Sequence, residues 1–407
     1  MASSSAHLLR QPPEVLHAIL IAVEPTDLAR LSQTCRELRD CIANDYLLWK
    51  RLYLQHFDCP ASHIEDETAD SFWQAQLQDI IRVDKILASG NISLKNEESS
   101  LEKVYSAAMA LLTEATSKPD KNSAFFARHF ARESNIAAFL ARSSLFASAR
   151  YPSNTPASSH ALRQASAKLF VYYGLEIEPH SFSVSAGRAT AVHPYARSRV
   201  YDLRRYTAAN HWGPFLDDGS EGIDWEKVQC ILIVILYNLR LSRCVQYNHR
   251  LCNSPFHGLA PKSFTSVPLN RRTGAPSPQD GGISSLAAQD PYGVTGTWMR
   301  IVCFLDYSDL YRFNFESPPL PESEARPPID TREALRLIRL QLHVTKIEWP
   351  DDSTVRTTRT GAIRWTTISV FQGEERWRSE AIQIGGIRSG RGAIGSWFDK
   401  DYDHHGA

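Results

Sequence analysis

The stretch that decides the fold of this chain is residues 12–57, PPEVLHAILIAVEPTDLARLSQTCRELRDCIANDYLLWKRLYLQHF. Its large apolar side chains recur three or four residues apart, which is the spacing of one face of an amphipathic helix. Pro25 ends the first apolar run, because a proline cannot continue a helix. Thr34 and Glu37 have the spacing of a capping box for a later helix. The stretch therefore predicts a compact cluster of short helices.

A segment this short cannot bury all of its large apolar side chains by itself. Part of its apolar surface must therefore meet another surface, which belongs either to the rest of the chain or to a partner.

The order of residues in this stretch resembles the F-box. The pattern is carried by Pro12, Glu14, Ile19, Leu20, Pro25, Asp27, Leu28, Leu31, Cys35, Arg36, Leu48 and Trp49. Two positions depart from it, since Gln11 stands where the family usually has leucine and Leu38 where it often has an aromatic residue. The alternative interpretation is an ordinary N-terminal helical subdomain.

The resemblance implies that this segment docks a Skp-type adaptor and, through it, a cullin in an SCF-type ubiquitin ligase. The residues that it assigns to adaptor binding are Pro12, Pro13, Glu14, Leu16, Ile19, Leu20, Pro25, Leu28, Leu31, Cys35 and Trp49. In such a complex the chain itself is a non-catalytic substrate receptor.

The composition excludes several classes of partner. Lys plus Arg and Asp plus Glu both number 45, whereas nucleic-acid-binding domains usually carry a basic excess, so we expect no nucleic-acid partner. The most apolar run, residues 228–241, is shorter than the roughly 20 residues of a membrane span. We therefore expect no membrane partner and predict a buried core helix that begins after Asp224.

The N-terminal residues and the cysteines indicate the cellular compartment in which we expect the protein. The first residues contain no apolar core of a signal peptide. The 7 cysteines are scattered without a disulfide framework, which fits a reducing compartment. We expect the protein in the cytoplasm, the nucleus or both.

The chain divides into three parts by pattern, and the predicted fold class is α+β. An F-box helical domain at 8–58 is followed by a helical spacer at 59–174 and by a mixed, β-rich domain at 175–407, with Pro- and Gly-rich loops at 254–295 and 316–330. The last part is predicted to hold an antiparallel β sheet or small barrel with one buried helix.

The β prediction rests on residues 295–398, where apolar and polar side chains alternate between turns. A short helix at Thr331–Leu337 is expected to lead into the sheet. The order of residues in 295–315, 373–392 and 395–406 also resembles a group of fungal F-box proteins. In that group the chain continues further, so the resemblance implies that a last strand is missing.

Three residue sets resemble sites of known chemistry, and each is better explained otherwise. Gly390, Gly392 and Gly395 match GxGxxG but lie between β-like runs, so they indicate turns or bulges. Cys244, His249, Cys252 and His257 have an irregular spacing for zinc, which favours free thiols. Asp399, Asp401 and Asp403 lack the glycine of a calcium loop, which favours a solvated acidic terminus.

A fourth set is the Tyr- and Arg-rich stretch 195–212. Its arginines are predicted to form cation–π contacts and ion pairs. Hydrolase, zinc-protease and P-loop motifs are not found in the sequence. We expect no catalysis, no cofactor and no metal.

The leading hypothesis is a substrate receptor whose β-rich domain binds an unknown protein target. Aromatic and arginine side chains near turns are typical binding anchors, and the candidates are Arg376, Arg378, Trp397 and Asp399. Strand alternation predicts Arg376 and Arg378 on one face and Trp377 on the other. The alternatives are an F-box scaffold without ubiquitin transfer and a β-barrel domain that binds a small ligand or acts as an enzyme.

Overall fold

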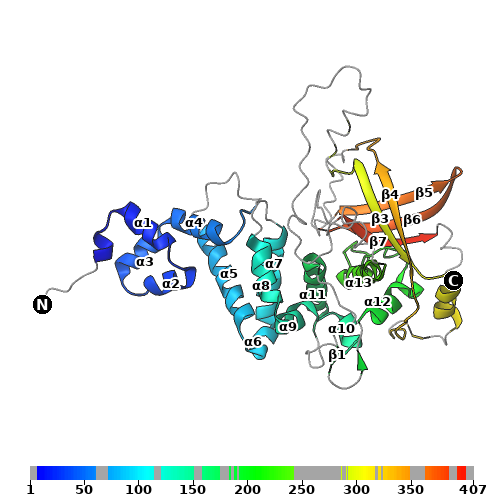
Figure 1. Cartoon of the computed structure of the whole chain (residues 1–407), viewed down its shortest axis with the longest axis horizontal. Coiled ribbons are helices and arrows are strands. Elements are labelled where there is room, and N and C mark those ends of the chain that lie inside the picture. The colour runs from blue at the N-terminus through cyan, green and yellow to red at the C-terminus, as the bar shows by residue number, and fades with distance from the viewer. Residues whose placement is uncertain are drawn as a thin grey trace, which may run out of the picture. The chain divides into compact units, whose positions relative to one another are not determined.

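In the computed structural model the chain forms two compact units, Met1–Asn135 and Ile136–Ala407, which are described one at a time (Figure 1). The boundary between them falls inside the segment 59–174 that the sequence groups as one spacer. The described residues are 7–60, 72–113, 121–150, 158–174, 183–184, 188–189, 192–242, 286, 290, 292–316, 320–321, 324–348, 363–384 and 392–399.

The first unit begins with the predicted cluster of short helices. They are the 3₁₀ helix η1 (His7–Arg10) and the α-helices α1 (Pro13–Ile21), α2 (Pro25–Leu31), α3 (Arg36–Ala43) and α4 (Tyr46–His56). Leu28, Leu48 and Leu52 are fully buried and form the core of this cluster. The indole Nε1 of Trp49 donates a hydrogen bond to the carbonyl of Ile42 over 2.8 Å, which joins α4 to α3.

The cap of α3 differs from the sequence prediction. Cys35 is the N-cap, and its Sγ accepts the backbone N–H of Leu38 at 3.4 Å. The hydroxyl of Thr34 instead donates to the carbonyl of Leu31 over 2.7 Å at the end of α2. The predicted capping box is therefore wrong, because the preceding helix end uses the threonine.

The remainder of the first unit is a bundle of longer helices. They are α5 (Phe72–Ala88), α6 (Ile92–Asn96), α7 (Glu98–Thr113), α8 (Lys121–Phe130) and α9 (Glu133–Asn135). The buried carboxylate of Asp58 accepts the backbone N–H groups of Lys121 and Asn122, both at 3.1 Å. It thus binds otherwise unpaired donors at the start of α8 and fixes this helix to the end of the F-box-like stretch.

The second unit is organised around α13 (Trp225–Leu241), whose Val228 and Leu232 are fully buried. The carboxylate of Asp224 accepts the backbone N–H of Lys227 at 3.1 Å, so the predicted start of a buried helix after Asp224 is confirmed. The other helices of this unit are η3 (Ile136–Leu140), α10 (Ser144–Ser148), α11 (His160–Tyr173), α12 (His193–Val200), η4 (Leu203–Arg205), α16 (Tyr307–Tyr311) and η5 (Arg312–Glu316).

The strands of the second unit pair antiparallel. They are β1 (Ser183–Val184) with β2 (Arg188–Ala189), β3 (Gly296–Phe304) with β4 (Ala334–Leu342), and β5 (Ile363–Phe371), β6 (Glu374–Gln383) and β7 (Ala393–Asp399) in one sheet. The predicted α+β class with antiparallel sheets is confirmed. Within the described ranges the strands form separate sheets and do not close into a barrel.

One element of the β-rich part was predicted wrongly. Residues 334–337 lie in strand β4, whereas the sequence predicts a helix at Thr331–Leu337. Leu335 and Leu337 are partly buried, and Arg336 between them is exposed. This alternation is typical of a strand, because successive side chains point to opposite faces of the sheet.

The β3–β4 ribbon packs across the β5–β6–β7 sheet, as Figure 1 shows. The rings of Trp298 on β3 and Trp365 on β5 lie 5.3 Å apart between centroids. Near them, Arg300 Nη2 lies 3.5 Å from the hydroxyl of Ser379 on β6. The two β layers therefore share a partly apolar contact face.

Candidate functional site

The structure separates the residues assigned to adaptor binding into two groups. Leu16, Leu20, Leu28 and Trp49 are at most 7% exposed and belong to the core of the helix cluster. Pro12, Pro13, Glu14 and Ile19 are exposed, and Pro25, Leu31 and Cys35 are partly exposed. Only the second group offers side chains to a partner, and the binding role of the whole set stays a prediction.

Two exposed apolar pairs on the same helices complete this surface. Val15 and Ile19 on α1 are 42% and 40% exposed, and their i, i+4 spacing places them on one helix face. Tyr46 and Leu47 at the start of α4 are 41% and 44% exposed. Val15, Tyr46 and Leu47 were not assigned to adaptor binding from the sequence. Large apolar residues on the solvent-facing side of a helix could have indicated a contact surface there.

The orientation of α1 is fixed by a polar contact. Nδ1 of His17 lies 2.6 Å from Oδ2 of Asp45, whose Oδ1 accepts the backbone N–H of Leu48 at 2.9 Å as the N-cap of α4. One carboxylate thus holds both helices that present the exposed apolar pairs.

In the second unit, four side chains from four strands form a connected set, here called the aromatic–arginine surface: Phe304, Arg336, Trp377 and Trp397. Arg336, Trp377 and Trp397 are exposed, and Phe304 is partly exposed. The guanidinium carbon of Arg336 lies 5.3 Å from the ring centre of Phe304. The ring of Phe304 contacts Trp397 at 6.4 Å, and Trp397 contacts Trp377 at 6.0 Å, both edge-on. Trp377 and Trp397 remain 43% and 39% exposed, so this surface is open to a partner.

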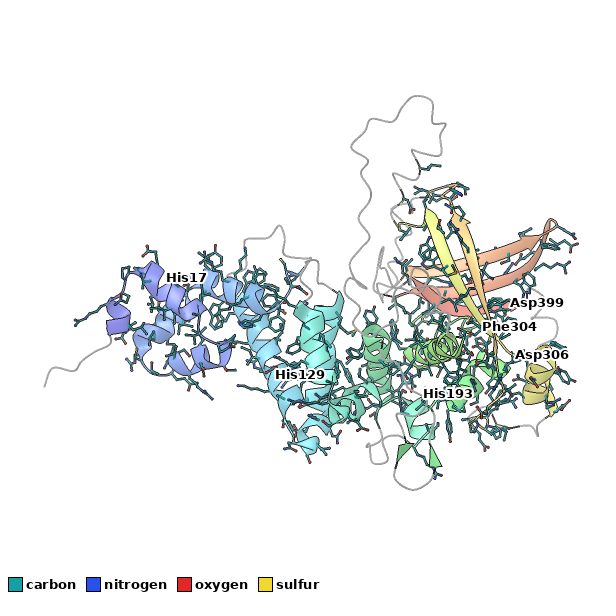
Figure 2. All side chains as sticks on the ribbon, viewed as in Figure 1. His17, His129, His193, Phe304, Asp306 and Asp399 are labelled. Atoms are coloured by element: carbon teal, nitrogen blue, oxygen red, sulfur yellow. The ribbon has the colours of Figure 1, made fainter. Side chains whose placement is uncertain are left out.

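The other predicted target-binding residues lie around this surface. Arg378 pairs with Glu375, and Arg376 Nη2 lies 3.7 Å from a carboxylate oxygen of Glu374. Asp399 is opposite Trp377 in the strand register, and Figure 2 places Asp399 at the same end of the β layers as Phe304. Their role in target binding stays a prediction.

The predicted alternation of Arg376 and Arg378 is disrupted. Trp377 is opposite Ser369, but the next matched pair is Glu375 with Val370, so Arg376 is an extra residue in a β-bulge. A bulge breaks the period of two. The expectation that Arg376 and Arg378 share a face therefore fails locally.

The Tyr- and Arg-rich stretch contributes a buried ion-pair network rather than a surface. Arg197 is 2% exposed, its Nε donates to Oε2 of Glu333 over 2.8 Å, and its guanidinium lies 4.7 Å from the ring centre of Tyr237. Asn238 also donates to Oε2 of Glu333 over 2.7 Å. The prediction of ion pairs and cation–π contacts is confirmed for Arg197.

Two titratable groups near this network are strongly perturbed. Burial lowers the pKa of His193, stacked on Tyr237 at 3.8 Å, to about 4, with a smaller contribution from Arg197. Burial also raises the pKa of the Cys303 thiol to about 12. A raised pKa disfavours the thiolate, which is the nucleophilic form of cysteine.

The remaining sequence candidates are mostly outside the described residues, namely Cys244, His249, Cys252, His257, Gly390, Asp401 and Asp403. Gly392 has a φ of +70°, and a side chain at Gly395 in β7 would collide with the backbone of β6, so these glycines serve a turn and a close strand contact. No group of three or more His, Cys, Asp or Glu residues is arranged for a metal among the described residues.

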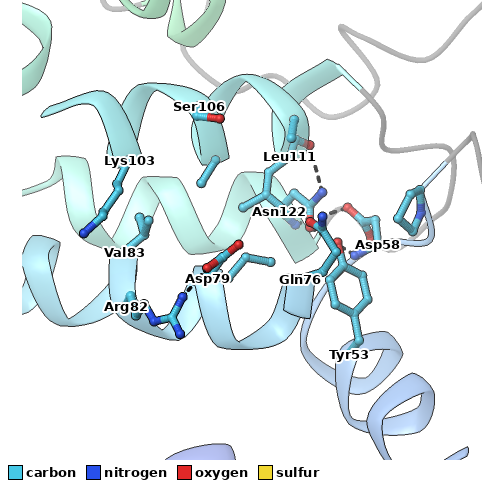
Figure 3. A pocket seen from close by; sticks show the side chains of 14 residues that line it. Tyr53, Asp58, Gln76, Asp79, Arg82, Val83, Lys103, Ser106, Leu111 and Asn122 are labelled. Carbon is cyan, nitrogen blue, oxygen red and sulfur yellow. Dashed lines mark hydrogen bonds and ion pairs between the residues drawn. The ribbon is translucent and has the colours of Figure 1, made fainter. Parts of the chain in front are cut away.

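A pocket of about 240 Å³ lies in the first unit, lined by α5, α7 and the end of α4 (Figure 3). Asp58 and Asn122 in its wall bond to backbone groups of the protein, and Asp79 pairs with Arg82 at 2.5 Å. Gln76, Lys103 and Ser106 also line the pocket, so its wall holds polar side chains besides those engaged within the protein.

Residues 10–55 match the family model described as F-box-like. No curated protein and no solved structure matches the chain. None of the helices in the described part of the chain is long and apolar enough to cross a membrane.

Proposed function

Because the chain is an F-box protein, with its F-box-like domain at residues 10–55, we propose that it is the substrate receptor of an SCF-type ubiquitin ligase. The F-box-like helices dock a Skp-type adaptor and, through it, a cullin. The second unit recruits the protein target. The chain contributes no chemistry of its own, because holding a target lysine near activated ubiquitin raises the effective concentration of the two reactants.

The observation that carries the adaptor proposal is the exposed apolar pair Val15 and Ile19 on α1. Large apolar side chains on one helix face of a small domain are typical of a protein interface. Pro12 and Pro13 directly precede and begin this helix, so its position relative to the incoming chain is restrained.

Target recruitment is proposed for the second unit, at the aromatic–arginine surface and the neighbouring Arg376, Arg378 and Asp399. Aromatic and arginine side chains dominate binding hot spots because they bury much area with few rotatable bonds. The described cysteines are free thiols, which agrees with a reducing compartment, and the proposed location is the cytoplasm, the nucleus or both.

The adaptor proposal is tested with a matched pair of variants. Ile19→Asp places a charge in the proposed interface, whereas Ile92→Asp changes a 66% exposed isoleucine on α6 of the same unit. We expect Ile19→Asp to abolish co-purification of a Skp-type adaptor and Ile92→Asp to retain it, since an unpaired buried charge costs several kcal/mol. Equal adaptor capture by both folded variants contradicts the proposal.

Target transfer is tested separately. A captured target should be ubiquitinated in a reconstituted ligase that contains wild-type chain, and not with Ile19→Asp. A target that is bound but never modified would instead identify a scaffold without ubiquitin transfer.

A further inference from the structure

The β3–β4 pair of the second unit carries arginines that have no acidic partner among the described residues, and Arg300 and Arg336 are two of them. Within the described residues neither Arg300 nor Arg336 takes part in an ion pair, whereas Arg364 on the neighbouring sheet pairs with Glu380 at 2.8 Å. The closest polar contact given for Arg300 is the 3.5 Å approach to Ser379. Arg300 is also partly withdrawn from water, so its charge is incompletely compensated.

The strand register brings these cations to one face. Arg300 is opposite Ile338, and Arg336 is opposite Val302, in the antiparallel β3–β4 pair. Opposite residues share a face, and so do residues two positions apart, so Arg300, Arg336 and Ile338 lie on the face of Phe304. Ile338 is 40% exposed. Arg336 and Ile338 are exposed, whereas Arg300 is partly covered by β6, where it approaches Ser379. Cationic and apolar side chains are therefore adjacent at the part of this face that the other β layer leaves open.

We propose that this face, Arg300, Arg336 and Ile338 together with the aromatic–arginine surface, docks an acidic segment of the target protein. The inference rests on the proposed function and names the class of target. Asp or Glu carboxylates of the segment pair with Arg336 and Arg300, and an apolar side chain of the same segment packs on Trp397 and Trp377. Charge complementarity selects the segment, and the aromatic rings supply contact area.

The surroundings favour an acidic protein segment over a nucleic acid. Glu374, Glu375 and Asp399 lie on the β6 and β7 strands beside Trp377. A phosphate backbone, which carries a charge at every nucleotide, would meet these carboxylates, whereas a short peptide segment can place its carboxylates at the arginines alone. Nucleic-acid sites need a broader basic patch, and the chain has a net charge of zero.

The test uses the full chain and a fluorescent peptide of alternating Glu and Leu residues ending in Phe, read by anisotropy. Matched probes replace Glu by Gln or by Lys, and a single-stranded oligonucleotide of equal charge is a further probe. We expect the Glu peptide to bind at least about tenfold more tightly than the Gln peptide, and the Lys peptide and oligonucleotide to bind more weakly still.

The variants compare two arginines of one strand. Arg336→Glu should weaken binding of the Glu peptide by about tenfold or more, and Arg336→Lys should retain most of it. Arg339→Glu is the matched control, because Arg339 is exposed on the same strand but is opposite Met299, on the other face. Its effect should stay within about threefold, as for a charge outside an interface.

Equal losses for Arg336→Glu and Arg339→Glu would mean general charge attraction and would overturn the inference. Tighter binding of the oligonucleotide would overturn it too. Ile19→Asp should bind the Glu peptide like wild type. If the wild-type chain fails to capture the adaptor but binds the Glu peptide, only the proposed function is contradicted. If the wild-type chain captures the adaptor but does not bind the Glu peptide, only the acidic-segment inference is contradicted.

Discussion

The F-box-like helices and the interior of the second unit are stabilised in different ways. The helix cluster buries aliphatic side chains such as Leu28, together with Trp49, around local contacts. The second unit instead buries charges, since Arg197 and Glu333 meet across 136 residues of chain and their side chains are 2% and 0% exposed. Aliphatic burial tolerates changes of pH, whereas a buried ionic network depends on every partner and on protonation.

The largest expected effect is the removal of Arg197. Arg197→Ala leaves the buried carboxylate of Glu333 without its cation, which should lower the free energy of unfolding of the second unit by about 3–5 kcal/mol. Urea unfolding followed by hydrogen exchange of α12 and α13 measures this. Exposed Arg336→Ala is the control, with less than about 0.5 kcal/mol expected. Equal costs for both variants would mean that the network does not stabilise this unit.

A double variant distinguishes the contribution of charge from that of packing in the Arg197–Glu333 network. Arg197→Met with Glu333→Leu removes both charges and should recover part of the lost stability, because apolar residues can replace a buried ion pair. If the double variant is as unstable as Arg197→Ala, the packing shape and not the charge is responsible.

Leu28→Ala is the corresponding change in the F-box-like helices. Leu28 is fully buried, so its truncation should cost about 2–5 kcal/mol through lost burial and a cavity. The cost should be the same at pH 7 and pH 5, measured by thermal unfolding of the helix cluster. A cost that changes with pH would contradict the contrast between the two regions. Because Leu28 is core, its substitution cannot serve as a selective test of adaptor docking.

His193 predicts a pH dependence in the second unit. Its pKa is lowered from 6.5 to about 4, so the fold favours the neutral imidazole. The stabilisation is fully present above pH 6.5 and is lost as the pH falls toward 4, by at most about 3 kcal/mol at 1.36 kcal/mol per pKa unit. His193→Phe should retain the ring contact with Tyr237 and show a flatter stability profile between these values. Parallel profiles for wild type and variant would contradict the assignment.

These two regions also differ in how far the sequence predicts them. The helix cluster and α13 follow from apolar spacing, because neighbours in the sequence are neighbours in the structure. The pairing of Arg197 with Glu333 is not predictable in this way, since no local pattern links residues so far apart. The same limit applies to the contact of Phe304 with Trp397.

Predictions of local structure from the sequence were wrong where two interactions compete for the same residue. Thr34 bonds to the end of α2, which leaves Cys35 as the cap of α3. The bulge at Arg376 is likewise a matter of strand register, which depends on β5 and not on β6 alone. The adaptor-binding assignment included Leu16 and Leu28 without indicating that both are core residues, because the spacing of apolar residues does not distinguish packing from contact with a partner.

The smallest expected effect concerns the polar contact that joins the F-box-like helices. Asp45 caps α4 through Oδ1 and contacts His17 on α1 through Oδ2. Asp45→Ala removes both interactions and should cost about 1 kcal/mol, whereas Asp45→Asn keeps a capping oxygen and should cost less. Thermal unfolding of the helix cluster measures the two costs. If Asp45→Asn costs as much as Asp45→Ala, the His17 contact and not the cap stabilises the helix cluster. The helix cluster would then depend on a charged side chain, as the interior of the second unit does.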